Sequence, residues 1–574
     1  MPSPSHPASF HKDDSLTVAA ANGGLARNEM IEHTARFTRR LCAVTDNVRC
    51  VVGNGLSNQT FVEGPDGLIV IDTGESKEEM AAALADVRKL TNAPIAAVIY
   101  SHFHYISGTQ ALIDAGADPH LPIWSHEGVL ANIQRQAGEV GPISRSGLIY
   151  QFGILLPDEG PNALVGVGIG KEFRSSDHAP FTNGFLPPTE TFSEPVTTTL
   201  AGLTVELTPA PSDADDSITI WFPELDVCVN NLVWPALFNV FPIRGEEYRD
   251  PRTLLTGFDH IIDLGAEHLI GTHGPPISGK DQVRDEVTRS RDAVQFMWDQ
   301  TVRGINLGMT FGELTEFVQL PDLYAESYLQ SQHYGLVEHH VRQIHIGLRG
   351  WFDGDEATLF PVPPVDRAHR LVEGFGGTQE VRAQADAALA DDDLRWALEL
   401  STWLVRADDS SQPDRDRLAA VLRAVGQRTT AANIRNWCLT RARHLDRSMD
   451  TDRFRSHRFA RSQLLNGPAD ASLHLLRVML EPTLCERADR HVRLEFRDAR
   501  SGLHVRNGVA VPTDGDGAAL VLSLERSTWA DVLTGVQTVA EAIDSGDIHV
   551  TGNEDDVIEF FSWFDHPGLS PEPA

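Results

Sequence analysis

Cysteine is scarce in this sequence, and long apolar runs are absent. The 574 residues include five cysteines and no Cys-x-x-Cys pair. This excludes a disulfide framework and a structural zinc ribbon, and it favours a reducing compartment over secretion. No apolar run approaches the ~18–20 residues that cross a bilayer, and residues 1–15 lack the apolar segment of a signal peptide. We therefore expect a cytoplasmic protein with no membrane span.

Positive charge is also in short supply. Lysine and arginine together number 48, against 81 aspartates and glutamates, which gives a formal net charge of −33. An acidic surface repels phosphate backbones and anionic membranes, so we do not expect nucleic acid as a partner. The expected partner is a small molecule, and an anionic substrate would need a local basic group in its site.

The composition is that of a globular protein with several domains. Hydrophobic residues make up 41% of the chain and charged residues 22%, which is typical of soluble domains. At ~150 residues per domain, the length corresponds to about four units. The texture of the chain divides it into an N-terminal arm (1–45), an α/β segment (46–285), a helical continuation (286–368), a helical domain (369–450) and a mixed domain of strands and helices (451–574).

A βαβ unit is predicted near the start of the α/β segment. Residues 67–74 form a continuous apolar run bounded by turn residues, as expected of a buried strand. Ser76 and Glu79 have the spacing of a capping box, which predicts a helix through about Leu90. A second buried strand is predicted at residues 95–100. Strand, helix and strand in this order indicate an α/β fold.

The N-terminal arm is expected to be loose with one helix, and helices dominate residues 285–445, whereas the rest of the chain also contains strands. The predicted helices lie at 25–41, within 285–360, at 379–445 after a break at Gly376-Gly377, and at 553–564, and further strands lie at 218–222, 225–229, 268–270, 519–524 and 547–551. Asn553 is the expected N-cap of the last helix.

Two histidines follow the second strand of the βαβ unit. His102 and His104 are two positions apart, and in extended chain such side chains face the same way. Imidazole is a preferred ligand of zinc, iron, copper and nickel. Because the chain has 23 histidines, some such pairs arise by chance, so the pair alone is weak support for a metal site.

Other predicted strand ends carry further candidate ligands. Asp213 lies in an acidic loop before one strand, and Asn231 and His273 follow the ends of two others. Side chains at successive strand ends of one α/β segment converge on one edge of a sheet, where such folds place their sites. The sequence therefore predicts a metal site at this edge.

The order of these elements resembles the metallo-β-lactamase superfamily and, more narrowly, its alkylsulfatase branch. The stretches that carry the resemblance outside the metal segment are 347–354 (GLRGWFDG), 361–364 (PVPP), 393–397 (DLRWA), 426–437 and 546–552 (GDIHVTG). The resemblance implies an αββα sandwich at 46–285, helices at 286–368 that complete the active site, an all-α dimerization domain at 369–450 and an α+β domain similar to sterol carrier protein 2 at 451–574. It also implies a homodimer.

The ligand set departs from the family motif HxHxDH. The chain keeps His102 and His104 but has Ile106 in place of the aspartate and Ser107 in place of the third histidine. By the resemblance, Asp213 falls where the family has a glutamate ligand of the first metal.

Two more positions belong to the second metal of the family. Asn231 falls where a glutamate bridges both metals, and His273 matches a histidine of the second site. A neutral asparagine is a poor bridge, so two tightly held ions are not expected. We expect one or two divalent ions, with zinc first and iron as the alternative.

The resemblance also assigns catalytic residues. Asn239 and Arg244 match the family's asparagine and its sulfate-binding arginine, and His339 matches the histidine that protonates the leaving alcohol. Arg244 would be the local basic group, since a guanidinium can fork onto an oxyanion. His340, beside His339, leaves the identity of the proton donor open.

Three functions remain open at this point. The favoured one is metal-dependent hydrolysis of a sulfate or related anionic ester of a small, partly apolar molecule. The second is a mononuclear non-haem iron oxygenase, or another tailoring enzyme on this fold, that uses His102, His104 and Asp213. The third is a non-catalytic assembly or lipid-binding protein.

Overall fold

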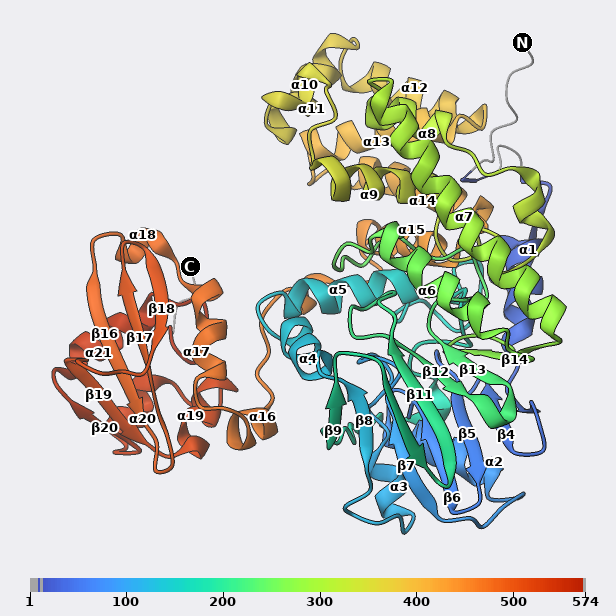
Figure 1. Ribbon diagram of the computed structural model, residues 1–574. Helices are drawn as coiled ribbons and strands as arrows, with labels where there is room; N and C mark the ends of the chain where they lie inside the picture. The colour runs from blue at the N-terminus through green and yellow to red at the C-terminus, as the bar shows by residue number, and fades with distance from the viewer. Residues whose placement is uncertain (1–8, 11–13, 571–574) are drawn as a thin grey trace. The chain divides into compact units, whose positions relative to one another are not determined.

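The computed structural model describes residues 9–10 and 14–570. Two compact units divide the chain, Met1–Ile133 with Ser146–Asp452 and Gln134–Arg145 with Arg453–Ala574 (Figure 1). Most of the segment 1–15 considered above for a signal peptide lies outside the described residues. Within the described ranges, no helix is both long and apolar enough to cross a membrane.

The first unit contains two sheets. Among the described residues, one sheet has seven strands in the order β3 (Arg40–Ala43), β4 (Val48–Val52), β5 (Gln59–Gly64), β6 (Gly67–Ile71), β7 (Ile95–Ile99), β8 (Ile123–His126) and β9 (Glu190–Phe192). The other has six strands in the order β10 (Val196–Leu200), β11 (Leu203–Pro209), β12 (Ile218–Phe222), β13 (Val227–Asn230), β14 (His268–Gly271) and β15 (Ile277–Ser278).

The two sheets face each other across an apolar core, and helices cover their outer faces. Alternate side chains of both sheets fill the shared core, including Ile69 and Ile99 of one sheet and Ile220 and Val229 of the other. α2 (Lys77–Val87) and α3 (Gln110–Asp114) pack on the outer face of the first sheet. α6 (Pro251–Leu264) and α7 (Lys280–Asn306) pack on the outer face of the second. This is the expected αββα sandwich.

The predicted βαβ unit is confirmed. β6 and β7 pair in parallel and α2 connects them. Ser76 caps α2 by accepting a hydrogen bond from the backbone N–H of Glu79 at 3.1 Å. The carboxylate of Glu79 instead accepts from the N–H of Glu75 at 3.2 Å, so the capping box is shifted by one residue on its second side.

The N-terminal helix predicted at 25–41 is wrong in extent. The structure has a short hairpin of β1 (Thr17–Ala19) and β2 (Leu25–Arg27), followed by α1 (Asn28–Thr34). The fully buried guanidinium of Arg435 donates to the backbone oxygen of Leu25 at 3.0 Å. This long-range contact holds the segment in extended form, which no local pattern could predict.

Helices follow the sandwich, and the break at Gly376-Gly377 separates α11 from α12 as predicted. The remaining helices up to residue 445 are α4 (Val129–Ala137), α5 (Gly141–Phe152), α8 (Phe311–Phe317), α9 (Val337–Arg349), α10 (Glu356–Leu359), α11 (Pro364–Gly374), α12 (Thr378–Ala390), α13 (Leu394–Ala407), α14 (Gln412–Arg428) and α15 (Ala432–Leu445). α12 to α15 pack pairwise in sequence order.

The second unit is a sheet with helices. Its strands run in the order β18 (Val509–Thr513), β17 (Arg500–Arg506), β16 (Asp489–Glu495), β19 (Leu520–Leu524) and β20 (Ile548–Thr551). Its helices are α16 (Arg461–Asn466), α17 (Ala471–Leu476), α18 (Pro482–Cys485), α19 (Arg526–Leu533), α20 (Val539–Asp544) and α21 (Glu554–Ser562). The side chain of Asn553 caps α21 as predicted.

Candidate metal centre

The candidate metal centre lies at the carboxyl end of β7. This apolar strand pairs in parallel with β6 and β8, so the chain leaving it passes the sheet edge where α/β folds place their sites. His102 is fully buried, and the side chain of His104 is 10% exposed. Asp213 comes from the loop between β11 and β12 of the other sheet, so the closing of the sandwich creates the cluster.

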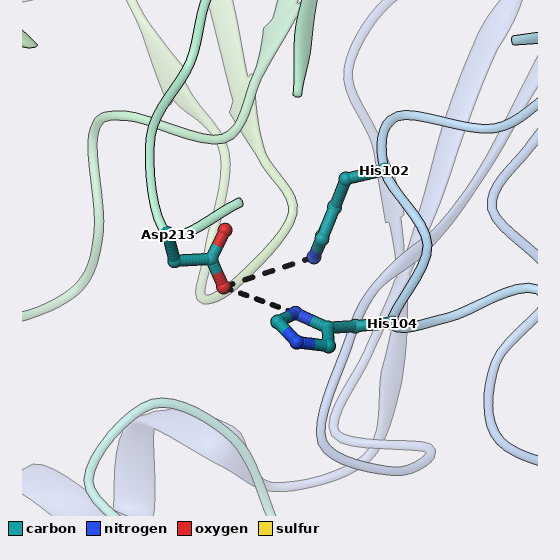
Figure 2. A group of neighbouring side chains, drawn as sticks. All are labelled: His102, His104 and Asp213. Carbon is teal, nitrogen blue, oxygen red and sulfur yellow. Dashed lines mark ion pairs between the residues drawn. The ribbon is translucent and has the colours of Figure 1, made fainter. Parts of the chain in front are cut away.

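The geometry of the three side chains suits a metal ion. The Oδ2 atom of Asp213 lies 3.8 Å from Nε2 of His102 and 3.2 Å from Nδ1 of His104 (Figure 2). One ligand atom from each residue lies within 4.8 Å of the others. Nε2 of His102 is buried and has no hydrogen-bond partner, which a ligand would explain. Two nitrogens and one carboxylate fit a divalent ion of the zinc or iron type.

Ser101 and Asp72 set the tautomer of His102. The hydroxyl of Ser101 donates to Oδ2 of Asp72 at 2.7 Å, and its backbone N–H donates to Oδ1 at 2.8 Å. The hydroxyl oxygen of Ser101 is then left to accept a hydrogen bond from Nδ1 of His102 at 2.9 Å. This places the lone pair of the ring on Nε2, the atom that faces Asp213.

His104 lies between two carboxylates. Its Nδ1 faces Asp213, and its Nε2 lies 3.2 Å from Oε1 of Glu246. Burial opposes the charged imidazole, but Asp213 and Glu246 raise the pKa of His104 to about 9. Burial also opposes the charged form of Asp213, yet His102 and His104 hold the pKa of that carboxyl well below its usual range. A metal ion at Nδ1 of His104 would replace a proton there.

Two arginines meet at Glu246. Nη1 of Arg244 pairs with Oε1 of Glu246, and Nη2 of Arg244 lies 3.3 Å from Nε2 of His104. Arg249 donates to Oε2 of Glu246 at 2.5 Å and to the backbone oxygen of Asn239 at 2.7 Å. Burial opposes the Glu246 carboxylate, but Arg244 and His104 lower the pKa of Glu246 to about 2. The expected basic group therefore lies beside the metal cluster.

Several buried polar atoms of Asn239, Arg244 and Arg249 have no hydrogen-bond partner. Both amide atoms of Asn239 and the Nε atoms of Arg244 and Arg249 are buried without a hydrogen bond. Buried donors are rarely left unpaired. The unpartnered N–H groups could therefore donate hydrogen bonds to a ligand that accepts them, such as an anion.

The two histidines of α9 differ in their surroundings. His339 packs against the ring of Phe241, with ring centroids 5.9 Å apart, and its Nδ1 has no partner. His340 is fully buried, and its Nδ1 accepts from the backbone N–H of Phe241 at 3.1 Å. A methyl group added to Gly335 would lie 2.2 Å from Oδ1 of Asn239 and 2.6 Å from Cε1 of His340. Asn239 and His340 thus border the same glycine.

Comparisons with known proteins identify the family. The family model described as metallo-beta-lactamase superfamily matches residues 52–229, alkyl sulfatase dimerisation matches 310–448, and alkyl sulfatase C-terminal matches 462–570. A linear primary-alkylsulfatase of a Pseudomonas species is 34% identical over 526 residues, which cover 88% of this chain and 98% of the relative. The chain belongs to the alkylsulfatase family of the metallo-β-lactamase superfamily.

Other alkylsulfatases agree. An (R)-specific secondary-alkylsulfatase of Pseudomonas is 28% identical, covering 89% of this chain and 78% of the relative. The solved structure of the stereoselective inverting sec-alkylsulfatase Pisa1 from Pseudomonas superposes with a TM-score of 0.83 at 25% identity, covering 96% of this chain and 91% of that one. The predicted family and fold class are confirmed. The dimerisation model covers parts of both segments assigned above to 286–368 and 369–450.

The other two ligands predicted from the alkylsulfatase pattern contact the cluster or its neighbours through hydrogen bonds. Nδ2 of Asn231 donates to Oδ1 of Asp213 at 2.5 Å, so this side chain supports a ligand. His273 is buried, its Nδ1 bonds to the backbone oxygen of Leu56 at 3.0 Å, and its Nε2 lies 3.4 Å from the hydroxyl of Tyr105. Within the described residues, the metal-ligand spacing does not group His273 with the two histidines and Asp213.

Sequence reasoning missed three charged residues of this alkylsulfatase site. Asp72 follows directly on the buried strand β6, and a carboxylate at a parallel strand end is a signal that could have found it. Glu246 and Arg249 follow Arg244 in a segment without helix or strand. No spacing rule marks them, because their role arises from contacts with His104 and Asn239.

Proposed function

We propose that this chain is a metal-dependent hydrolase that cleaves a sulfate, or related anionic, ester of a small and partly apolar molecule. The observation that carries the proposal is the position of the Arg244 guanidinium, 3.3 Å from the candidate ligand His104 and with an unpartnered buried Nε. An anion held there would have its ester bond beside the metal. The names of the similar proteins, which are alkyl and alkyl/aryl sulfatases, support the same chemistry.

We propose zinc as the metal, held by Nε2 of His102, Nδ1 of His104 and the carboxylate of Asp213. When bound, such an ion acts as a Lewis acid and lowers the pKa of water. The two-nitrogen, one-oxygen donor set supports zinc and leaves iron as the alternative that a measurement must exclude.

Arg244 and Asn239 are the proposed anion-binding residues. A guanidinium offers paired N–H donors to sulfate oxygens, and the unpartnered amide of Asn239 supplies another donor. His339 is the proposed proton donor to the leaving alcohol. Its neighbour His340, whose Nδ1 accepts from a backbone N–H and whose buried Nε2 has no partner, is the other candidate donor and supplies the comparison variant on the same helix.

The test is sulfate release from linear and secondary alkyl sulfates and from an aryl sulfate by the purified protein. We expect release in the zinc-loaded enzyme, and loss of both bound metal and release in His104→Ala. Elemental analysis of the same preparations distinguishes zinc from iron. Full sulfate release after metal removal, or no release from any of the three classes, would contradict the proposal.

We also propose a homodimer formed by the helical region that matches the dimerisation family. Support comes from large apolar side chains that this region exposes, among them Trp351 at 61%, Phe360 at 88% and Val365 at 56%. Exposed apolar groups gathered in one region are typical of protein interfaces. Light scattering measures the mass in solution, and a monomer at micromolar concentration would contradict this proposal.

Two further proposals concern the second unit and the location of the protein. We propose that the C-terminal unit has a sterol-carrier-like fold, supported by its mixed five-stranded sheet packed against helices. Displacement of a fluorescent fatty acid would test whether it binds lipids.

We propose a cytoplasmic location, supported by five free cysteines, and fractionation of cells would test it.

A further inference from the structure

We propose that the centre holds one metal ion and that the chain itself fills the second metal position of the fold. This inference rests on the proposed function for the presence of the first ion. It concerns the residues that stand where a second ion would need ligands, and each of them is already committed to another contact.

His273 is the imidazole that the family pattern places at the second metal, and both of its nitrogens have a contact. Nδ1 bonds to the backbone oxygen of Leu56, a carbonyl that can only accept, so Nδ1 carries the proton. Nε2 is left to accept from the hydroxyl of Tyr105, 3.4 Å away. The hydroxyl of Tyr105 is therefore the group that contacts the lone pair of Nε2, the one that a second ion would require.

The ring of Tyr105 fills the space between the two sides of the site. Its centroid lies 5.2 Å from that of His102 and 5.3 Å from that of His273, nearly perpendicular to both. Tyr105 is 5% exposed. Its aromatic ring thus separates His273 from the ligands of the first ion.

Ile106 turns away from the centre into the apolar core. It bridges to Gly74 in parallel and packs in the cluster beneath α2 and α3. Ile106 is 2% exposed, so its position cannot present a ligand without removing a side chain from that core. The backbone N–H of Ser107 also bonds to the oxygen of Gly74, at 3.0 Å.

Asn231 is suited to a single ion and poorly suited to two. Its Nδ2 donates to Asp213 at 2.5 Å, and its Oδ1 accepts from Nε1 of Trp234 at 3.2 Å. A carboxylate in place of this amide would face Asp213 as a second anion at contact distance, which is costly in a buried site unless a cation lies between them. With asparagine the pair is satisfied by a hydrogen bond instead.

The experiment counts ions per chain in the full-length protein. Apo protein is titrated with Zn²⁺ against a chromogenic chelator, and the dialysed zinc-loaded protein is measured by elemental mass spectrometry. We expect one tightly held zinc per chain in the wild type, in His273→Ala and in Tyr105→Phe, and none in His104→Ala. Circular dichroism tests whether each variant is folded. If His273→Ala does not fold, the ion count of Tyr105→Phe takes its place.

Two tightly held ions in the wild type would overturn the inference, whether or not one of them is lost in His273→Ala or Tyr105→Phe. The count is read without substrate, so it is independent of sulfatase activity. A count of one with no sulfate release would leave this inference standing and overturn the proposed function. A count of two with sulfate release would overturn this inference and leave the proposed function standing.

Discussion

The Oε1 atom of Glu246 lies 3.2 Å from Nε2 of His104, while Nδ1 of the same ring faces Asp213. A carboxylate that accepts from the outer nitrogen of a metal-binding histidine orients the ring and increases its basicity. Arg244 and Arg249 hold Glu246 in place from two sides. Glu246 therefore connects the proposed metal site to the proposed anion site.

Glu246→Gln is expected to weaken zinc binding by about 10–100-fold, the usual cost of losing such a carboxylate. The amide keeps the shape of the side chain but loses the charge that faces His104. The dissociation constant from chelator competition is the measurement, and the exposed neighbouring variant Glu247→Gln is the control. Equal affinities in the two variants would show that Glu246 does not position His104.

Arg244→Ala is expected to raise KM for an alkyl sulfate by about 10–100-fold, which corresponds to one lost charged hydrogen bond. Steady-state kinetics on the zinc-loaded protein gives this value. Arg252, whose side chain is 61% exposed and paired with Asp250, provides the control variant Arg252→Ala. An unchanged KM in Arg244→Ala would remove this guanidinium from anion binding.

His339→Asn is expected to slow hydrolysis of alkyl sulfates by about 10²–10⁴-fold, the range typical of a lost general acid. Aryl sulfates should be affected much less, because a phenolate leaves without protonation. The ratio of the two rates is therefore the informative quantity. His340→Asn should leave that ratio near the wild-type value, and a larger change in His340→Asn than in His339→Asn would reverse the assignment.

A stacked pair of histidines should make stability sensitive to acid. His33 and His333 lie 4.1 Å apart between ring centroids, and burial lowers their pKa values to about 4 and about 3. Both pKa values are lower in the folded than in the unfolded state, so the unfolded state gains protons first as the pH falls. The contribution of the two neutral histidines to the free energy of unfolding is complete above the unfolded pKa of about 6.5. It is lost as the pH falls toward 4.

His333→Phe should reduce this acid sensitivity while keeping a ring in the stack. One histidine whose pKa is lowered by folding reduces the free energy of unfolding by up to about 2 kcal/mol between neutral pH and about pH 5. The measurement is the difference between the thermal unfolding midpoints at about pH 7.5 and about pH 5, which should shrink in the variant. An identical difference in wild type and variant would place the acid sensitivity elsewhere.

Phe360→Asp is expected to shift the proposed dimer toward monomer, because it places a charge on a side chain that is 88% exposed in the single chain. Light scattering over a range of concentrations measures the shift. Leu307→Asp changes a leucine that is 62% exposed and lies outside the dimerisation match, and it should leave the mass unchanged. A dimer that tolerates Phe360→Asp and not Leu307→Asp would relocate the interface.

The sequence by itself determined the elements whose signals are local. The apolar run of β6, the cap at Ser76 and the two-residue spacing of His102 and His104 all predict features that the structure has. Apolar periodicity and capping act over a few residues, so these features can be derived without knowledge of the rest of the chain. Motif resemblance then supplied the family and the αββα fold.

The tertiary structure alone decided what depends on distant contacts. The extended form of residues 25–27 depends on Arg435, and the role of Glu246 depends on His104. The engagement of His273 by Tyr105 likewise joins strand ends far apart in the chain. Burial and hydrogen bonding between distant segments fix such side chains, because only the folded sandwich brings their charges and lone pairs within reach of one another.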